Sequence, residues 1–428
     1  MIGHRAPVLA IRTGLTRALV AALLVLAGLV APIAGNVPAH AAPSGSVTWG
    51  AGDDALVSQL RADLEAYLQA RGTAEHVSAA GLSVSLPGRW STIDVAAGTT
   101  TFGGSVPVGP DSVWQIGSNT KAFTSVLLLQ LEAEHRLAID DTLGKWLPQY
   151  PQWRDVPIRR LLNMTSGIAS YDDQPAWYAD YAADPHTYFS PERLVGYVLE
   201  APATSGYSYS NTNYVLAEMI IERVTGDSYQ DQLYRRIIEP LGLRGLYYRP
   251  HVYPTWVTSR EPAGYLFNDQ FPLPQLLGHD VSRDTLSWAR AAGGIISTTS
   301  DMTRWERALY GGHLLPPEQQ AELESLVSTT TGQPIARTSS TDPMGYGLGI
   351  AQLTDPQLGT FWFYEGSTLG FRALHAYFPD SGLIIAFGLN SGTAEAIDQS
   401  ATLMKTVYDT LRANGMICPR PVPADAGA

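Results

Sequence analysis

The sequence predicts an α+β protein (an α/β sandwich) in which helices flank one antiparallel sheet built from both chain ends. Segments with alternating apolar and polar residues, typical of strands, occur near the start and near the end of the chain. Between residues 158 and 310 the pattern changes to short helices separated by loops rich in Gly, Pro, Ser and Asp. Strands at both ends with helices between them predict a mainly helical lobe, 118–335, inserted into the sheet.

The two ends of the chain supply the predicted strands and their covering helices. Leu56, Leu60 and Leu64 recur at helical spacing and predict an amphipathic helix over 53–71. Segments 79–85 and 91–97 alternate like strands around a Pro-Gly turn, and 99–106 predicts an exposed turn or a further strand. Later, 361–364 predicts a strand, 373–378 and 383–389 a hairpin, and 396–413 a final helix. Residues 415–428, with three prolines, are predicted to be disordered.

The first 41 residues have the pattern of a signal peptide. Three arginines precede an apolar run over 18–34, and small residues follow at 39–41. An uncleaved anchor is the alternative, but the run is shorter than the roughly 20 residues of a membrane span and is broken by Gly28 and Pro32. We therefore expect cleavage before Ala42, a secreted hydrolase domain over 42–414, and no stable membrane insertion.

Composition narrows the class of protein further. The chain is 45% hydrophobic and 16% charged, which favours a folded globular protein. Its net charge of −12 disfavours nucleic acid as a partner, so a small-molecule or peptide substrate is expected, and the oligomeric state stays open. Cys418 is the single cysteine, so no internal disulfide forms. Metal-binding motifs are absent from the sequence, and we expect neither a metal nor another cofactor.

Ser118 and Lys121 are the candidate nucleophile and base. A serine hydroxyl becomes nucleophilic when a neighbouring group takes its proton, and positions three apart lie on the same face of a helix. Apolar positions after Ser118 predict a buried helix that begins there, with free amides directed at the serine. The alternative is a solvated lysine beside an N-cap serine. Against it, the chain has only three lysines, and Lys121 follows a neutral segment.

Two motifs resemble those of class C β-lactamases and D-alanyl-D-alanine carboxypeptidases, the penicillin-binding serine hydrolases. Ile-Gly-Ser-Asn-Thr-Lys at 116–121 is similar to their first motif, and Tyr209-Ser210-Asn211 is similar to their Tyr-x-Asn. The resemblance extends over about 113–390 and implies a β-lactamase/transpeptidase-like fold. It also implies that Ser118 is the nucleophile, that Tyr209 shares proton transfer with Lys121, and that Asn211 binds the substrate amide.

The third motif departs from the family pattern. The family has Lys or His, a small residue and Gly on an edge strand, followed by a second Gly and an aromatic residue. Gly370-Phe371 fits the trailing pair and places Tyr364, Glu365 and Gly366 at the motif. By the resemblance, Tyr364, Gly366 and Ser367 belong to the substrate-binding site, and the backbone amides of Ser118 and Ser367 form the oxyanion hole.

These replacements alter the expected recognition of a substrate carboxylate. Neutral Tyr364 beside anionic Glu365 removes the usual cation and opposes an anionic ligand. Arg372 is a candidate replacement for that cation, although a surface arginine on a strand is the simpler expectation. Met164, where the family often has His, is a second departure.

The predicted function is a secreted serine hydrolase that forms an acyl-enzyme on Ser118. The resemblance favours a D-alanyl-D-alanine carboxypeptidase acting on peptidoglycan-type peptides. Alternatives on the same fold are a β-lactamase, an esterase, or a D-amino-acid amidase or aminopeptidase, and a penicillin-binding-like sensor or scaffold without activity is a further alternative. A Ser-His-Asp hydrolase is disfavoured because the sequence has no Gly-x-Ser-x-Gly elbow, so His135, His313 and His375 are expected at the surface or in packing.

Overall fold

The computed structural model describes residues 51–89 and 91–417. The predicted signal peptide, its cleavage site at Ala42, Cys418 and most of the predicted disordered tail lie outside this part of the chain. Helices and a large antiparallel sheet make up the described residues, and the predicted α+β class is confirmed.

The large sheet has nine strands in the order β2-β1-β13-β12-β11-β10-β9-β7-β8, and every neighbouring pair is antiparallel. Strand β1 from the first quarter of the chain pairs with β13 near its end, so both ends build one sheet, as predicted. The strands are β1 (Ala79–Ser85), β2 (Ile93–Gly98), β7 (Leu326–Ser328), β8 (Pro334–Ile335), β9 (Met344–Tyr346), β10 (Ala351–Asp355), β11 (Gly359–Ser367), β12 (Arg372–Phe378) and β13 (Leu383–Leu389).

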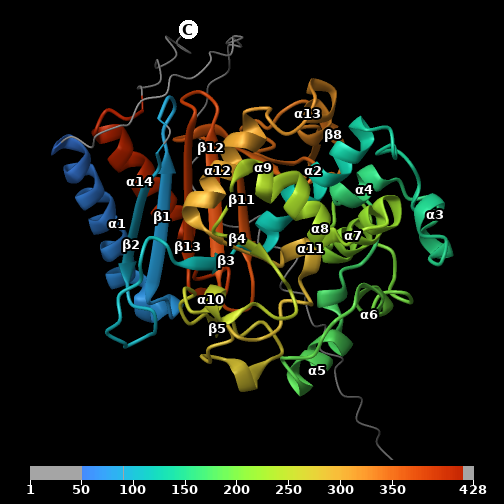
Figure 1. Ribbon diagram of the computed structural model, residues 1–428, viewed down its shortest axis with the longest axis horizontal. Helices are drawn as coiled ribbons and strands as arrows, with labels where there is room; N and C mark the ends of the chain where they lie inside the picture. Colours follow the sequence, from blue (N-terminus) through green and yellow to red (C-terminus); the bar gives the residue numbers. More distant parts are fainter. Residues whose placement is uncertain (1–50, 90, 418–428) are drawn as a thin grey trace, which may run out of the picture.

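Helices cover this sheet and form the lobe beside it (Figure 1). Helices α1 and α14 pack on each other beside β1 and β2, whereas α12 packs against β1, β12 and β13. The α-helices are α1 (Ala51–Glu75), α2 (Thr120–Ala133), α3 (Leu143–Trp146), α4 (Ile158–Leu162), α5 (Pro175–Ala183), α6 (Pro191–Gly196), α7 (Asn211–Thr225), α8 (Tyr229–Leu233), α9 (Glu239–Leu241), α10 (Thr255–Thr258), α11 (Arg290–Gly293), α12 (Thr299–Tyr310), α13 (Pro317–Leu323) and α14 (Ser400–Ala413).

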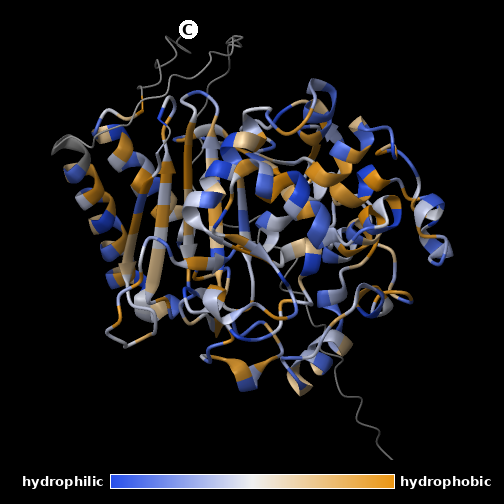
Figure 2. Cartoon of the chain, viewed as in Figure 1, coloured by the Kyte–Doolittle hydropathy of each residue, from blue (hydrophilic) through white to orange (hydrophobic). Residues whose placement is uncertain are grey.

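Burial explains the hydropathy pattern of these elements. The strands β1 and β13 are buried along their whole length, and Figure 2 shows much of the sheet as apolar. Helix α1 alternates between the two colours in Figure 2, because Leu56, Leu60 and Leu64 are fully buried while intervening residues face solvent. The predicted amphipathic helix is therefore confirmed.

A second, three-stranded sheet leads the chain to the candidate nucleophile. It has the order β3-β6-β4, with β3 (Val113–Gln115), β4 (Leu246–Tyr248) and β6 (Ile295–Thr298), and a parallel pair joins β5 (Tyr265–Phe267) to β14 (Ser391–Thr393). Trp114 on β3 packs onto the large sheet where Gly81 and Gly388 are cross-strand partners. A Cβ at Gly81 would lie 2.7 Å from the indole, so this glycine makes room for Trp114. The region 118–335 thus contains strands as well as helices.

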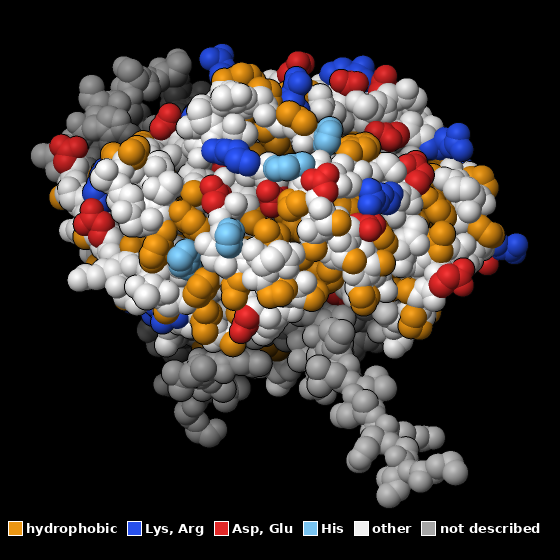
Figure 3. Space-filling view, turned by 90° about the horizontal axis from the view of Figure 1, so that it is seen from below, with side chains coloured by type: hydrophobic (Ala, Val, Ile, Leu, Met, Phe, Trp, Pro, Cys, Tyr) orange, Lys and Arg blue, Asp and Glu red, His pale blue; other side chains and the backbone are white. Residues whose placement is uncertain are grey.

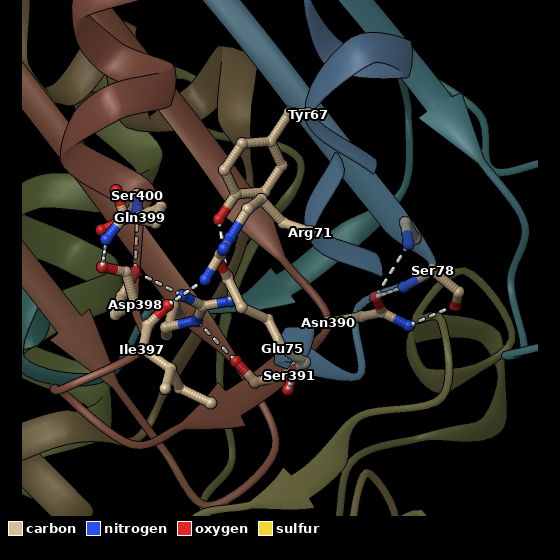
Figure 4. A network of polar contacts seen from close by, with 12 residues as sticks. Tyr67, Arg71, Glu75, Ser78, Asn390, Ser391, Ile397, Asp398, Gln399 and Ser400 are labelled. Atoms are coloured by element: carbon tan, nitrogen blue, oxygen red, sulfur yellow. Dashed lines mark hydrogen bonds and ion pairs between the residues drawn. The ribbon is translucent and has the colours of Figure 1, made fainter. Parts of the chain in front are cut away.

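The final helix begins at Ser400, four residues later than the sequence predicts. Asp398 accepts a hydrogen bond from the Ser400 amide at 2.7 Å and an ion pair from Arg372 at 2.5 Å. These bonds fix a turn ahead of the helix. Arg372 itself is only 2% exposed, so the expectation of a surface arginine is wrong. Its guanidinium also pairs with Glu75 at the end of α1, at 2.8 Å, within the polar network shown in Figure 4.

Within residues 51–89 and 91–417, no helix combines the length and the apolar character needed to cross a membrane. The face shown in Figure 3 mixes apolar, acidic, basic and histidine side chains.

Candidate active site

Ser118 lies in a single 3-10 turn, η1 (Gly117–Asn119), between β3 and α2. Gly117 has φ +50°, a backbone conformation that favours glycine. The Asn119 side chain donates hydrogen bonds to the carbonyl oxygens of Ile116 at 2.8 Å and of Ala373 on β12 at 2.9 Å. The turn is thereby fastened to the large sheet, and Ser118 remains partly exposed at the start of α2.

Lys121 is fully buried one turn further along, and its Nζ contacts three oxygen atoms. These are Oγ of Ser118 at 3.0 Å, Oδ1 of Asn211 at 2.7 Å and the carbonyl oxygen of Ala292 at 2.8 Å. Burial lowers the pKa of Lys121 well below its usual value, while the Asp172 carboxylate opposes part of that shift. The alternative of a solvated lysine does not fit this position.

The contacts of Lys121 assign its hydrogens. A neutral amine has two N–H donors and one lone pair. When Lys121 is in this neutral form, the oxygen atoms of Asn211 and Ala292, which can only accept, take both hydrogens, and the lone pair faces the Ser118 hydroxyl. This is the arrangement a general base requires.

Tyr209 contacts the same hydroxyl from the opposite side. Its OH donates to Oγ of Ser118 at 2.7 Å, and its ring centroid lies 4.8 Å from Nζ of Lys121. Burial raises the pKa of Tyr209, and its hydrogen bonds with Ser118 and Tyr364 act in the other direction. The phenol therefore holds its proton near neutral pH. The structure brings Ser118, Lys121 and Tyr209 together.

Asn211 begins α7 and is held by a residue that the sequence did not single out. Its Nδ2 donates to Oδ2 of buried Asp172 at 2.7 Å, and its backbone amide donates to Oγ of Ser170 at 2.9 Å. Ser170 also hydrogen-bonds Asp172. Burial raises the pKa of Asp172, while the hydrogen bonds from Ser170 and Asn211 lower it. Its one sequence signal is an acidic pair, 172–173, in an aromatic segment.

The end of β11 runs directly beside the nucleophile turn. A Cβ at Gly366 would lie 2.0 Å from the Ile116 carbonyl oxygen and 2.7 Å from the Ser118 amide nitrogen. A Cβ at Gly117 would likewise lie 2.6 Å from the Ser367 amide nitrogen. Glycine at both positions lets the two backbones approach, as an oxyanion hole formed by the amides of Ser118 and Ser367 would require.

Strand alternation separates the other two residues of the third motif. Tyr364 is 1% exposed and donates to the Tyr209 hydroxyl at 3.3 Å, and it is not among the residues that line the pocket. Glu365 points to the opposite face of β11, lines the pocket, and accepts a hydrogen bond from Oγ of Ser400 at 3.2 Å. Burial, and then the Asp398 carboxylate, raise the pKa of Glu365 well above its usual value. The expected substrate-binding position of Tyr364 thus differs from the one observed.

The pocket over Ser118 has aromatic walls and acidic groups. Among the described residues that line it there is no Lys or Arg, and the two charged residues are both acids. Its lining residues are Ser118, Tyr171, Asp172, Trp177, Tyr209, Asn211, Phe271, Trp288, Ala289, Ala292, Gly293, Glu365, Ser367, Thr368 and Leu369. The described residues contain no cluster of three or more His, Cys, Asp or Glu side chains suited to a metal ion.

His375 lies behind the nucleophile turn. Its Nδ1 is 2.8 Å from Oδ1 of Asn119 and 3.1 Å from Oε1 of buried Glu306. Burial lowers the pKa of His375 to about 3, so the ring stays neutral. His375 packs in the core, as expected from the sequence.

The fold and the site define a serine hydrolase that works by acyl transfer. The chain belongs to the β-lactamase family, whose model, described as Beta-lactamase, matches residues 28–405. It is 29% identical to penicillin-binding protein 4 of Amycolatopsis lactamdurans over 338 residues, which cover 75% of this chain and 83% of the relative. It is 27% identical to penicillin-binding protein 4* of Bacillus subtilis over 285 residues, which cover 64% of this chain and 60% of the relative.

Two solved structures have the same fold. A D-stereospecific amidohydrolase from Streptomyces sp. is 30% identical, with a TM-score of 0.67, and the match covers 81% of this chain and 98% of the other. The D-amino acid amidase of Ochrobactrum anthropi with L-phenylalanine has a TM-score of 0.70 at 22% identity, covering 85% of this chain and 99% of the other. The second likeness concerns the fold alone.

Proposed function

We propose that the protein hydrolyses amide bonds of amino acids or short peptides that carry a free amino group, with a preference for D-configured residues. Glu365 in the pocket carries this proposal. A carboxylate at the edge of an apolar pocket attracts a substrate ammonium group and repels a substrate carboxylate. The aromatic walls Trp177, Phe271 and Trp288 suit an apolar side chain. The similarity to the Streptomyces amidohydrolase supports the D-preference.

The proposed reaction proceeds through an acyl-enzyme. The Ser118 hydroxyl gives its proton to Lys121 as Oγ bonds to the substrate carbonyl carbon, and the amides of Ser118 and Ser367 bind the resulting oxyanion. Tyr209 then gives its proton to the leaving nitrogen as the C–N bond breaks, and Lys121 returns a proton to Tyr209. Water attacks the ester by the same proton path and frees the acid and Ser118.

A D-alanyl-D-alanine carboxypeptidase is the second candidate, favoured by the two relatives named penicillin-binding proteins. Such a substrate ends in a carboxylate, and the described pocket offers it no lysine or arginine. A sensor or scaffold without activity is less favoured, because Lys121 and Tyr209 both contact Oγ of Ser118 at hydrogen-bond distance.

The test compares three substrates on the purified protein. D-phenylalanine amide is expected to be cleaved at least tenfold faster, by kcat/KM, than its N-acetyl derivative and than L-phenylalanine amide. N-acyl-D-Ala-D-Ala is expected to be a poor substrate. Ser118→Ala should abolish all turnover while the circular dichroism spectrum stays unchanged. Preferential cleavage of N-acyl-D-Ala-D-Ala would establish the carboxypeptidase instead, and penicillin labelling of Ser118 without any turnover would favour a sensor.

We also propose that the protein is exported. The basic and apolar leader over 1–41 supports this. N-terminal sequencing of the protein recovered from culture medium should begin at Ala42, and a product that starts at Met1 in the cell pellet would contradict export.

A further inference from the structure

We propose that Tyr364 is a positioning residue that holds Tyr209 ready to donate its proton. Tyr346, Tyr364 and Tyr209 form a chain of phenol hydrogen bonds that all point toward Ser118. This inference rests on the acyl-transfer function proposed above. It gives Tyr364 a part in proton transfer at the place where the family has a cation.

Three phenols form a continuous chain that ends at the nucleophile. The Tyr346 and Tyr364 hydroxyls are 2.5 Å apart, Tyr364 donates to Tyr209 at 3.3 Å, and Tyr209 donates to Oγ of Ser118 at 2.7 Å. Tyr346 and Tyr364 are fully buried, at 0% and 1% exposure. They belong to β9 and β11, which pair with β10 between them, so the sheet fixes their positions.

The number of hydrogens sets the direction of this chain. Each phenol has a single O–H to donate. The hydrogen of Tyr209 goes to Ser118 and that of Tyr364 goes to Tyr209, so Tyr346 is the donor to Tyr364. In the neutral form of Lys121, the Ser118 hydrogen in turn faces the lone pair of that amine. All the hydroxyls therefore donate in one direction along the chain.

Such a chain matters when Tyr209 protonates the leaving nitrogen. Negative charge then develops on the phenol oxygen in a buried place, and the Tyr364 O–H, already aimed at that oxygen, stabilises it. Lys121, which holds the proton taken from Ser118, reprotonates Tyr209, so the charges cancel at the end of the step. A cation at position 364 would do the same for Tyr209, but it would also repel a substrate ammonium group. A neutral donor avoids that repulsion.

The test pairs Tyr364→Phe with a matched control, Tyr207→Phe. The Tyr207 ring lies 5.6 Å from the Tyr346 ring, yet its buried hydroxyl has no hydrogen-bond partner in the described part of the chain. Both variants remove one hydroxyl from the same aromatic cluster. We expect Tyr364→Phe to lower kcat/KM for D-phenylalanine amide about 10- to 100-fold with little change in KM, and Tyr207→Phe to leave it within twofold of wild type.

The leaving group provides a readout that a purely structural role would not change. The amide nitrogen must take up a proton to leave as ammonia, whereas p-nitrophenolate leaves without a proton. The deficit of Tyr364→Phe should therefore shrink to less than about threefold on D-phenylalanine p-nitrophenyl ester. Tyr346→Phe should show a smaller deficit with the same dependence, and it keeps the test decisive if Tyr364→Phe fails to fold.

Equal losses on amide and ester, or a Tyr364→Phe variant that matches Tyr207→Phe, overturn the inference. Wild-type protein that cleaves neither substrate overturns the proposed function itself. Wild-type activity on the amide combined with unaffected tyrosine variants overturns only the hydrogen-bond chain.

Discussion

Replacing Arg372 with methionine is expected to destabilise the protein through the charge that the variant leaves behind. The guanidinium is 2% exposed and pairs with Glu75 at 2.8 Å and with Asp398 at 2.5 Å. Glu75 keeps two donors in the variant, Arg71 at 2.8 Å and the Tyr67 hydroxyl at 2.6 Å. Asp398 loses its only ion pair within the described residues, so one carboxylate becomes uncompensated.

The expected loss of stability follows from the Asp398 carboxylate, which is left without its cation. Removing one partner of a buried ion pair costs about 3–5 kcal/mol in free energy of unfolding. Unfolding entropy of about 2.1 cal/mol/K per residue, taken over residues 51–417, gives about 0.8 kcal/mol/K, so the melting temperature should fall by about 4–6 °C.

Scanning calorimetry at pH 7.5 measures this fall in melting temperature. Arg412→Met is the matched control, because Arg412 is 57% exposed and pairs with Asp409 at 3.1 Å, a surface contact worth about 0–1 kcal/mol. Adding Asp398→Asn to Arg372→Met should recover part of the loss. Melting of Arg372→Met within 1 °C of the control would refute the reasoning.

Three further predictions concern the site. Gly366→Ala should lower kcat/KM for D-phenylalanine amide by about 100-fold or more, because its Cβ would lie 2.0 Å from the Ile116 carbonyl oxygen. The control Gly196→Ala has open space around its Cβ and should leave kcat/KM unchanged. Burial raises the pKa of Glu365, and only its ionised form attracts the ammonium, so KM for this cationic substrate should fall as the pH rises through the titration of Glu365. Glu365→Gln should raise KM about tenfold and flatten this profile. Because burial lowers the pKa of Lys121, kcat/KM should rise with pH well below the pH range in which a lysine ordinarily titrates. Lys121→Met should lose about 10³-fold in rate. An active variant whose rate does not depend on pH would contradict the role of Lys121 as base.

Local patterns predicted those parts of the fold that depend on local sequence. The strand-like pattern of β1, the turn between β12 and β13, and the leucine spacing in α1 gave these elements to within four residues at each end. The helical period of α1 reflects its one buried face and turn residues mark a hairpin locally, so both are visible without knowledge of the partner. The proximity of Ser118 and Lys121 was predictable for the same reason, because one helical turn relates them.

Contacts between distant segments were not predictable in this way. Asp172 reaches Asn211 across 39 positions and Arg372 reaches Glu75 across 297, and neither spacing leaves a periodic trace. The sequence suggested a surface position for Arg372 because it sits on a strand, but that strand lies between β11 and β13. Glu75 at the end of α1 and Asp398 ahead of α14 enclose the guanidinium. Likewise, the carbonyl of Ala292 that orients Lys121 is a backbone group, which any residue type could supply.

The third motif shows how a local pattern and a distant contact combine. The sequence identified the loss of the family cation at Tyr364 and the gain of an acid at Glu365, and strand alternation alone requires the two side chains to face opposite ways. Only the tertiary structure assigns the faces, with Tyr364 toward Tyr209 and Glu365 toward the pocket. Under the proposed function the two replacements act together. The Tyr364 phenol keeps a hydrogen-bond donor at Tyr209 without adding positive charge, and the Glu365 carboxylate makes the pocket favourable to an amine. Reversing either change alone should therefore weaken the binding of amine substrates. A cation at 364 would repel the ammonium group, and loss of the carboxylate at 365 would remove the attraction.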